Sequence, residues 1–357
     1  MGNADKIIGK TTRRLAPAER GASRPDDGRL WEVLAGIWSY PAFLVAHQIK
    51  LFELLSARSL TLEEVAGAKG LERRPAEALL AVCTSLGFVE KARERYRLTP
   101  LSRTYLLESS PTYFGHFLDG VTQLYPLFSV ENVRRAAQSN SPQSDLSPAE
   151  NQFEALGWQA ERVRMFTRAM HSLSVAPAMA WPAKLDLSKN SAMLDIGGGS
   201  GAHAIGAVRR RPKLRATVID AGPVCEVARE YINRAELSNR ITTHVADMWN
   251  DPFPEADLHF YSYIFHDWPP DKCRILSRKS FDALPSGGRI VVHEALYNNQ
   301  KTGPFAAGAY SMIMLGWTTG RQYSGKEISE MLAEAGFVGI QIKPTFGFMS
   351  IVTGRKP

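Results

Sequence analysis

The amino-acid sequence predicts an α/β protein in which a parallel, doubly wound sheet follows a mainly helical N-terminal half. After Lys189, short apolar runs alternate with segments of helical periodicity, as is typical of strands joined by crossover helices. Before Lys189, most apolar residues recur at helical spacing instead. A glycine-rich turn directly after the first of these apolar runs indicates a ligand site, because such sheets bind ligands beyond the carboxyl ends of their strands.

The first helical segment covers residues 30–55, and we expect a break at Pro41. Its large apolar residues, such as Trp31 and Trp38, are too many for a helix that lies alone on a surface. The segment therefore needs a partner, which is either the rest of the chain or a second subunit. Residues 1–28 are rich in Arg, Gly, Pro and Asp without apolar periodicity, and we expect them to be disordered.

Two short helices and a hairpin come next. Thr61 and Glu64 fit a capping box at the start of the first helix, and the second helix covers residues 75–85 before a glycine ends it. The apolar runs 88–91 and 96–98 flank a charged turn and predict the hairpin. Helix, helix and hairpin in this order describe a winged helix.

We expect this winged helix to serve packing and dimerisation rather than DNA binding. Small apolar residues fill its second helix from Ala76 to Val82 and leave few side chains that could read base edges. The formal net charge is only +7, from 43 Lys and Arg against 36 Asp and Glu. Such a mild excess does not indicate a nucleic-acid partner.

The cysteines and the N-terminus indicate the cytoplasm. Cys83, Cys225 and Cys273 lie far apart, which predicts free thiols in a reducing compartment. No secretory signal opens the chain. The longest apolar stretch, residues 30–46, is interrupted by Glu, Ser and Pro, so we predict no membrane partner.

The pattern of elements divides the chain into four parts. Residues 1–28 form a disordered tail, 29–110 a winged-helix-like dimerisation domain, 111–178 a helical linker that contributes to the ligand pocket, and 179–357 the sheet domain. A polar loop interrupts the linker near residues 138–150. The expected strands of the sheet domain are 192–196, 216–220, 241–247, 257–264 and 289–296, with a closing hairpin of 339–344 and 348–353.

The strongest local motif is Leu-Asp-Ile-Gly-Gly-Gly-Ser-Gly at residues 194–201. A strand ends, Gly197, Gly198 and Gly199 turn the chain, and a helix begins near Ser200. The stretch also matches the dinucleotide fingerprint GxGxxA, so NAD is an alternative ligand. An NAD-dependent oxidoreductase is nevertheless disfavoured, because the sequence lacks a Tyr-x-x-x-Lys pair or a comparable hydride-transfer constellation.

Three carboxylates at successive strand ends favour S-adenosylmethionine over NAD. Asp195 precedes the glycines, where it can meet the cationic amino end of the methionine moiety. Asp220 ends the second strand, where it can accept hydrogen bonds from both ribose hydroxyls. Asp247 ends the third strand, where it can accept the adenine amino group while Met248 packs on the ring.

The fourth strand leads into His266 and Asp267. Methyl transfer from a sulfonium to a phenol is an in-line displacement, and a neutral imidazole can take the phenolic proton as the oxygen attacks. Glu294, at the end of the fifth strand, can fix the tautomer of His266, and Asp267 can orient the loop or assist the base. The next side chain, His293, points to the other face of the sheet and is interpreted as structural. The alternative for His266 is a cap on the following helix.

Several separate motifs resemble the small-molecule O-methyltransferases of plant phenylpropanoid (caffeate-type) and bacterial natural-product pathways. The resemblance covers about residues 30–357 and implies a Rossmann-like class I methyltransferase domain, a winged-helix-like dimerisation domain, a homodimer, a small-molecule acceptor and a role in secondary metabolism. The motifs are the glycine-rich turn, Ala-Asp-Met at 246–248, His-Asp-Trp at 266–268, Ala-Leu-Pro-Ser-Gly-Gly at 283–288 and Ala-Gly-Phe at 335–337.

The resemblance also implies roles for individual residues. It makes His266 the base, assisted by Glu294. The implied cofactor contacts are Gly197, Asp220, Asp247, Met248 and Ser262, and the implied acceptor contacts are Phe166, Met170, Met312, Ile313 and Trp317. Other aromatic residues could roof the acceptor pocket, although their helical spacing is more typical of a core, namely Tyr113, Phe114, Phe117, Tyr125 and Phe128.

Two positions depart from the family pattern. Where the family commonly has Glu-Arg-Thr before its last helix, residues 320–324 read Gly-Arg-Gln-Tyr-Ser, so Gln322 can hydrogen-bond but carries no charge. Leu173 lies where phenylpropanoid members often carry a His. The first departure leaves a C-methyltransferase, acting on an aromatic carbon or an α-keto acid, as the alternative. Some of those enzymes use a metal, but His266 and Asp267 have no convincing third ligand, so we predict none.

Overall fold

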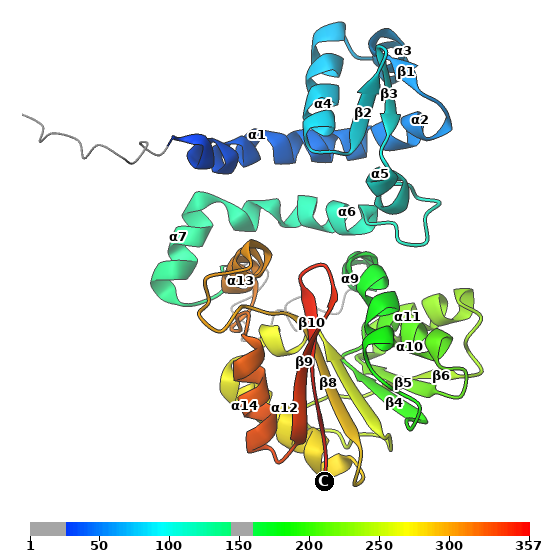
Figure 1. Ribbon diagram of the computed structural model, residues 1–357, viewed down its shortest axis with the longest axis vertical. Helices are drawn as coiled ribbons and strands as arrows, with labels where there is room; N and C mark the ends of the chain where they lie inside the picture. Colours follow the sequence, from blue (N-terminus) through cyan, green and yellow to red (C-terminus); the bar gives the residue numbers. More distant parts are fainter. Residues whose placement is uncertain (1–25, 144–159) are drawn as a thin grey trace, which may run out of the picture.

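The computed structural model describes residues 26–143 and 160–357. The predicted disordered tail, apart from its last three residues, and most of the predicted polar loop lie outside these ranges. Figure 1 shows the N-terminal helices and a small sheet stacked along the long axis above a larger sheet, with α6, α9 and α13 between them. Within the described ranges, no helix is both long and apolar enough to cross a bilayer.

The N-terminal part consists of helices around a three-stranded antiparallel sheet of order β1-β3-β2. The predicted capping box is present, with the Thr61 side chain accepting from the Glu64 N–H and the Glu64 side chain accepting from the Thr61 N–H. The elements are α1 (Gly28–Gln48), α2 (Leu51–Ala57), β1 (Leu60–Thr61), α3 (Leu62–Lys69), α4 (Arg73–Ser85), β2 (Val89–Ala92), β3 (Arg95–Leu98) and α5 (Pro100–Tyr105).

The predicted break at Pro41 is wrong. Helix α1 continues through Pro41 to Gln48, and the chain turns instead at Lys50, whose φ of 55° is left-handed. A proline inside a helix removes one backbone hydrogen bond and strains the preceding turn. Here Leu44 and Ala46, beyond the proline, are buried in the N-terminal core, and their burial holds the second half of α1 in line.

The large apolar side chains in the first half of α1 are not covered by other described residues of the chain. Trp31 is 57 % exposed and Trp38 is 61 % exposed. Leu30, Val33 and Ile37 are exposed beside them. The sequence predicts a partner for this segment, and the described residues of one chain do not supply it.

The middle of the chain joins the two parts. Helix α9 packs on α6 and on α10, and a Cβ on Gly206 of α10 would lie 2.2 Å from the Ala178 carbonyl oxygen of α9. Only glycine therefore allows this close approach. The elements here are α6 (Gly115–Leu124), η1 (Tyr125–Phe128), α7 (Val130–Ser139), α9 (Ala160–Ala180) and η2 (Trp181–Lys184).

The larger sheet has seven strands in the order β6-β5-β4-β7-β8-β10-β9 and confirms the predicted Rossmann-like α/β fold. Strands β4 to β8 are parallel, and β10 pairs antiparallel with both β8 and β9. The strands are β4 (Ala192–Ile196), β5 (Arg215–Asp220), β6 (Ile241–Val245), β7 (Leu258–Ser262), β8 (Arg289–Ala295), β9 (Val338–Phe346) and β10 (Met349–Arg355).

Helices cover both faces of this sheet (Figure 1). One apolar cluster joins the sheet to α10 (Ala202–Arg210) and α11 (Gly222–Arg234), and a second joins the opposite face to α12 (Pro270–Ala283) and α14 (Gly325–Glu334). Helix α13 (Phe305–Trp317) crosses the end of the sheet nearest the N-terminal part.

The fourth strand of the larger sheet ends earlier than predicted. Strand β7 stops at Ser262, because Tyr263 has a φ of 56° and turns the chain. The short helix η3 (Phe265–Asp267) follows and carries His266. The turn therefore places the imidazole beyond the carboxyl end of the sheet.

Candidate active site

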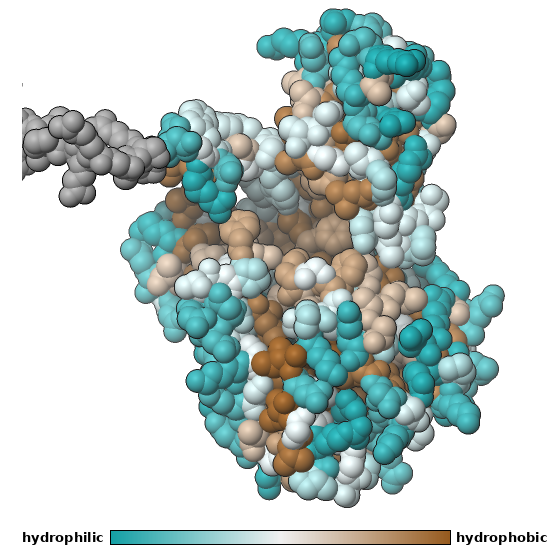
Figure 2. Space-filling model, in the orientation of Figure 1, coloured by the Kyte–Doolittle hydropathy of each residue, from teal (hydrophilic) through white to brown (hydrophobic). Residues whose placement is uncertain are grey.

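A cavity of about 1000 Å³ lies beyond the carboxyl ends of β4, β5 and β7 and extends to α6, α9 and α13. Figure 2 shows an apolar hollow between the N-terminal part and the sheet domain. The cavity brings together most of the predicted site residues: Phe166, Met170, Asp195, Gly197, Gly198, Gly199, Asp220, Asp247, Met248, Ser262, His266, Asp267, Ile313 and Trp317.

Three predicted site residues lie elsewhere. Glu294 and Gln322 are buried behind His266 and contact its imidazole from there. Met312 is 44 % exposed, because the helical repeat of α13 turns Ile313 and Trp317 into the cavity and Met312 away from it. Met312 therefore does not line the cavity of a single chain, and its contact with the acceptor stays a prediction.

The glycine-rich turn and Asp220 form one end of the cavity. Gly197 and Gly199 have φ values of 63° and 57°, which L side chains rarely adopt. The Asp220 carboxylate accepts hydrogen bonds from the Gly199 N–H at 2.9 Å and the Ala221 N–H at 2.8 Å. Burial raises the pKa of Asp220 to about 6, against the opposing effect of these two hydrogen bonds. An acceptor-rich carboxylate at this place suits the hydroxyl donors of a ribose.

Asp195 lines the cavity but is almost fully buried against the turn. Its side chain is buried and accepts a hydrogen bond from the Ala204 N–H at 3.2 Å, and burial raises its pKa to about 7. A Cβ on Gly198 would lie 2.7 Å from the Asp195 Cγ, so glycine is required above it. This placement makes Asp195 an organiser of the turn, and its contact with an ammonium group stays a prediction.

Asp247, Met248 and two tryptophans form the neighbouring wall. The Asp247 carboxylate accepts hydrogen bonds from the backbone N–H of Trp249 at 2.9 Å and from the Asn250 side-chain amide at 2.7 Å. The Trp249 ring stands edge-on to Trp268, with centroids 4.8 Å apart. The sequence did not single out these tryptophans as pocket residues, although Trp268 belongs to the His-Asp-Trp motif.

The Ser262 hydroxyl lies 3.2 Å from the Nδ1 of His293, whose Nε2 lies 2.9 Å from the Thr345 hydroxyl. These contacts place His293 on the face of β8 that does not meet His266, as the alternation of side chains predicts. Ser262 therefore lines the cavity with its hydroxyl already held by a structural histidine.

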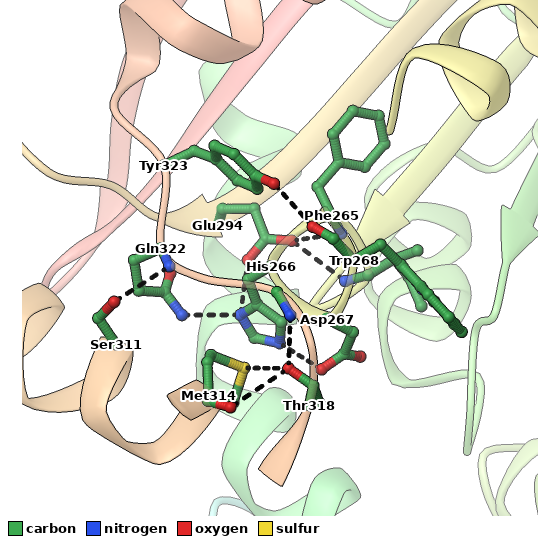
Figure 3. A network of polar contacts seen from close by, with 12 residues as sticks. Phe265, His266, Asp267, Trp268, Glu294, Ser311, Met314, Thr318, Gln322 and Tyr323 are labelled. Carbon is green, nitrogen blue, oxygen red and sulfur yellow. Dashed lines mark hydrogen bonds and ion pairs between the residues drawn. The ribbon is translucent and has the colours of Figure 1, made fainter. Parts of the chain in front are cut away.

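His266 is held from behind by two side chains (Figure 3). Its Nδ1 lies 3.1 Å from a carboxylate oxygen of Glu294 and 3.0 Å from the amide nitrogen of Gln322. The other oxygen of Glu294 accepts from the N–H groups of Ile264 and Phe265 at 3.1 and 3.0 Å. Glu294 thus binds both the imidazole and the turn that carries it, and this favours the tautomer with the proton on Nδ1.

The other ring nitrogen of His266, Nε2, lies 3.5 Å from a carboxylate oxygen of Asp267, which lines the cavity. Burial acts to lower the pKa of His266, but the negative charges of Glu294 and Asp267 outweigh it and raise this pKa to about 9. The arrangement therefore stabilises the imidazolium, the form that a general base adopts after it has taken a proton.

Gln322 gives the site a neutral partner. Its backbone N–H donates to the Ser311 hydroxyl at 3.4 Å, and the next residue, Tyr323, donates its hydroxyl to the Trp268 carbonyl at 2.7 Å. These bonds fix the segment that holds the amide against His266. In the folded site, an uncharged amide therefore lies beside His266 at position 322, where the family commonly has a glutamate.

Aromatic side chains form the other end of the cavity. The rings of Phe166 and Trp317 stack at 6.3 Å with an interplanar angle of 14°. From the sequence alone, five further aromatic residues could either cover the pocket or belong to a core. Of these, Phe117 and Phe128 line the cavity, whereas Tyr113, Phe114 and Tyr125 do not. Tyr310 also lines it, and its helical spacing with Ile313 and Trp317 could have revealed this.

Among the residues that the structure describes, no group of three or more His, Cys, Asp or Glu side chains is placed to hold a metal ion. His266 and Asp267 therefore have no third ligand of these types in the described ranges, and the prediction that no metal takes part stays a prediction.

Comparisons with known proteins agree on one family. The model of the O-methyltransferase domain matches residues 144–338, and that of the O-methyltransferase dimerisation domain matches residues 31–108. The chain is 35 % identical over 309 residues to the 3-hydroxy-5-methyl-1-naphthoate 3-O-methyltransferase of Streptomyces sahachiroi, covering 86 % of this chain and 88 % of that protein. It is 32 % identical over 320 residues to the acetylserotonin O-methyltransferase of Gallus gallus, covering 87 % and 92 %.

The fold also agrees with that of a solved methyltransferase structure. The crystal structure of human N-acetylserotonin methyltransferase in complex with S-adenosylmethionine superposes with a TM-score of 0.81 at 28 % identity, covering 94 % of this chain and 99 % of that chain.

Proposed function

Because the chain belongs to the family of S-adenosylmethionine-dependent O-methyltransferases, we propose that it methylates a hydroxyl group of a small aromatic or enolic molecule with His266 as the general base. The observation that carries this proposal is the His266 imidazole in the cavity wall, tied through Nδ1 to the buried Glu294. A histidine that only capped the following helix would not need a buried carboxylate on its other side.

The cofactor end of the cavity fits S-adenosylmethionine. Asp220 would accept the ribose hydroxyls, Asp247 the adenine amino group, and Met248 would pack on the adenine ring. Gly199 leaves open space where any other residue would place a Cβ, which allows the cofactor to approach the backbone. The cofactor supplies a methyl group on a positively charged sulfur.

His266 would take the proton of the acceptor hydroxyl on Nε2 while Nδ1 donates to Glu294. The resulting imidazolium lies between two carboxylates, Glu294 and Asp267, so its charge is stabilised without solvent. We assign Glu294 as a positioning residue and Asp267 as an assistant to the base. Gln322 would lie against the imidazole ring without adding charge, and because its amide nitrogen is itself a donor it makes no hydrogen bond to a protonated Nδ1.

The acceptor end suits a flat, apolar molecule. Phe166 and Trp317 present stacked rings, and Met170 and Ile313 add apolar surface to the same end. We therefore propose an aromatic acceptor, as the names of the naphthoate and acetylserotonin O-methyltransferases indicate for those relatives.

We further propose that a second copy of the chain covers the apolar face of α1, which includes Trp31 and Trp38. The match of residues 31–108 to a dimerisation domain supports this. We also propose that residues 29–110 form the dimerisation domain, 111–178 the helical linker and 179–357 the methyltransferase domain. We propose the cytoplasm as the location of the protein.

The decisive experiment incubates the protein with cofactor carrying a labelled methyl group and a panel of phenols, enols and α-keto acids, with and without a chelator. We expect label on an oxygen of a phenol or enol, with no effect of the chelator. Label on carbon, or loss of transfer with the chelator, would replace this proposal by the C-methyltransferase alternative.

A further inference from the structure

Tyr310 lines the cavity but has no role in the proposed mechanism. It lies on α13, and its ring stacks on the His266 imidazole with centroids 5.3 Å apart and an interplanar angle of 29°. It also faces Tyr263, with ring centroids 6.0 Å apart. Tyr310 therefore forms the wall of the cavity directly beside the proposed base.

The Tyr310 hydroxyl makes no hydrogen bond to any residue that the structure describes, in contrast to the other tyrosines near the site. The Tyr263 hydroxyl donates to the Met349 sulfur at 3.5 Å, and the Tyr323 hydroxyl donates to the Trp268 carbonyl at 2.7 Å. The Tyr261 hydroxyl lies 2.6 Å from the Ser280 hydroxyl. The Tyr310 side chain is only partly buried and lines the cavity, so its hydroxyl is available to a ligand.

This hydroxyl is a neutral donor. Burial raises the pKa of Tyr310 well above its ordinary value, and the charges of Tyr263, Asp267 and Glu294 act in the same direction. The neighbouring carboxylates disfavour an anionic ligand group close to them, so the matching group is a neutral oxygen.

We propose that Tyr310 is a specificity-determining residue whose hydroxyl donates a hydrogen bond to a second oxygen of the acceptor, on the ring carbon next to the reacting hydroxyl. Tyr310 and His266 are adjacent in the cavity wall, with ring centroids 5.3 Å apart, so a flat acceptor that meets the imidazole also meets Tyr310, and oxygens on neighbouring ring carbons can reach both. The preferred acceptors are then aromatic rings with two vicinal oxygen functions, either a diol or a hydroxy-carbonyl pair. This inference rests on the proposed O-methylation at His266.

The test compares 2,3-dihydroxynaphthalene with 2-naphthol, which lacks the second oxygen. In the unmodified protein we expect a higher kcat/KM for the diol, and Tyr310→Phe should reduce the ratio of the two values roughly three- to tenfold, the usual effect of one neutral hydrogen bond. Tyr263→Phe is the matched control, because its hydroxyl lies in the same wall but is bonded to Met349. This control should leave the ratio unchanged.

Two results would overturn the inference: a ratio that Tyr310→Phe does not change, and an equal loss for both acceptors, which would mean that Tyr310 only orients His266. Calorimetry on the protein saturated with S-adenosylhomocysteine gives the same ratio as dissociation constants, without turnover. Binding of the diol that depends on Tyr310 but leads to no methylation would support the inference and count against the proposed function. Failure of both naphthalenes to bind, while another phenol is methylated, would overturn the inference and leave the proposed function in place.

Discussion

The two ends of the cavity are built in different ways. The cofactor end comes mostly from residues 195–251, with Ser262 and Trp268 added from beyond them, and here a glycine-rich turn and carboxylates at strand ends meet at one edge of the sheet. The acceptor end comes from side chains of α6, α9 and α13, which lie far apart in the chain. Changes in the helices can therefore alter the acceptor without disturbing the cofactor, because the two ends share few residues.

His266 lies where the two ends meet: Tyr310 of the acceptor end stacks on its ring, and the groups that contact its nitrogens belong to neither end. Its Nδ1 side is closed by Glu294 and Gln322, and its Nε2 side opens on the cavity beside Asp267. If the two ends are separable, changes at the cofactor end should affect cofactor binding, and changes around His266 should affect the rate.

The largest effect is expected from His266→Ala. Loss of the general base should lower turnover by about 10²–10⁴-fold, while the affinity for S-adenosylhomocysteine stays within about twofold. Steady-state kinetics and calorimetry measure the two quantities. Unchanged turnover would remove His266 from the mechanism, and a matching loss of cofactor affinity would show that the two ends are not independent.

Asp220→Asn should show the opposite pattern. Removal of the charged acceptor of the ribose hydroxyls should weaken binding of S-adenosylhomocysteine by roughly 10- to 100-fold, with turnover at saturating cofactor much less affected. Glu226→Gln, an exposed position on α11 that does not line the cavity, is a control for charge alone. Equal effects of the two substitutions in calorimetry would argue against a specific ribose contact.

The pH dependence of kcat/KM examines the charges behind His266. The base must be neutral, so kcat/KM should rise with pH until the imidazolium is lost near its pKa of about 9. Glu294→Gln removes the larger of the two stabilising charges, so the pKa should fall and the midpoint should move by about one unit to lower pH. A midpoint that does not move would exclude His266 as the titrating group.

Gln322→Glu is expected to have the smallest effect. A second carboxylate near Nδ1 would stabilise the imidazolium further, so the midpoint of the pH profile should shift upward and the rate at high pH should rise by a few-fold. Gln322→Leu is the uncharged control and should leave the midpoint at or below that of the unmodified protein. A downward shift with Gln322→Glu would show that position 322 does not act through His266.

Much of this site could be predicted from the sequence, because the necessary information is local. A strand with an acid near its end, a run of glycines and a histidine at the end of another strand each depend on neighbouring residues. The parallel sheet then brings the ends of successive strands to one edge, so Asp220, Asp247 and His266 meet without further information. The predicted strands all appear, with shifts of at most two residues at their ends.

The remaining features depend on packing between segments that are distant in the sequence. Pro41 stays inside α1 because the residues beyond it are buried, Met312 turns away from the cavity because α13 is rotated by its contacts, and Asp195 is almost fully buried against its turn. Tyr310 reaches His266 only because α13 crosses the end of the sheet. Residue type and spacing therefore fix where the strands carry their polar groups, but the rotation and contacts of each helix arise from side-chain packing, which a linear pattern does not contain.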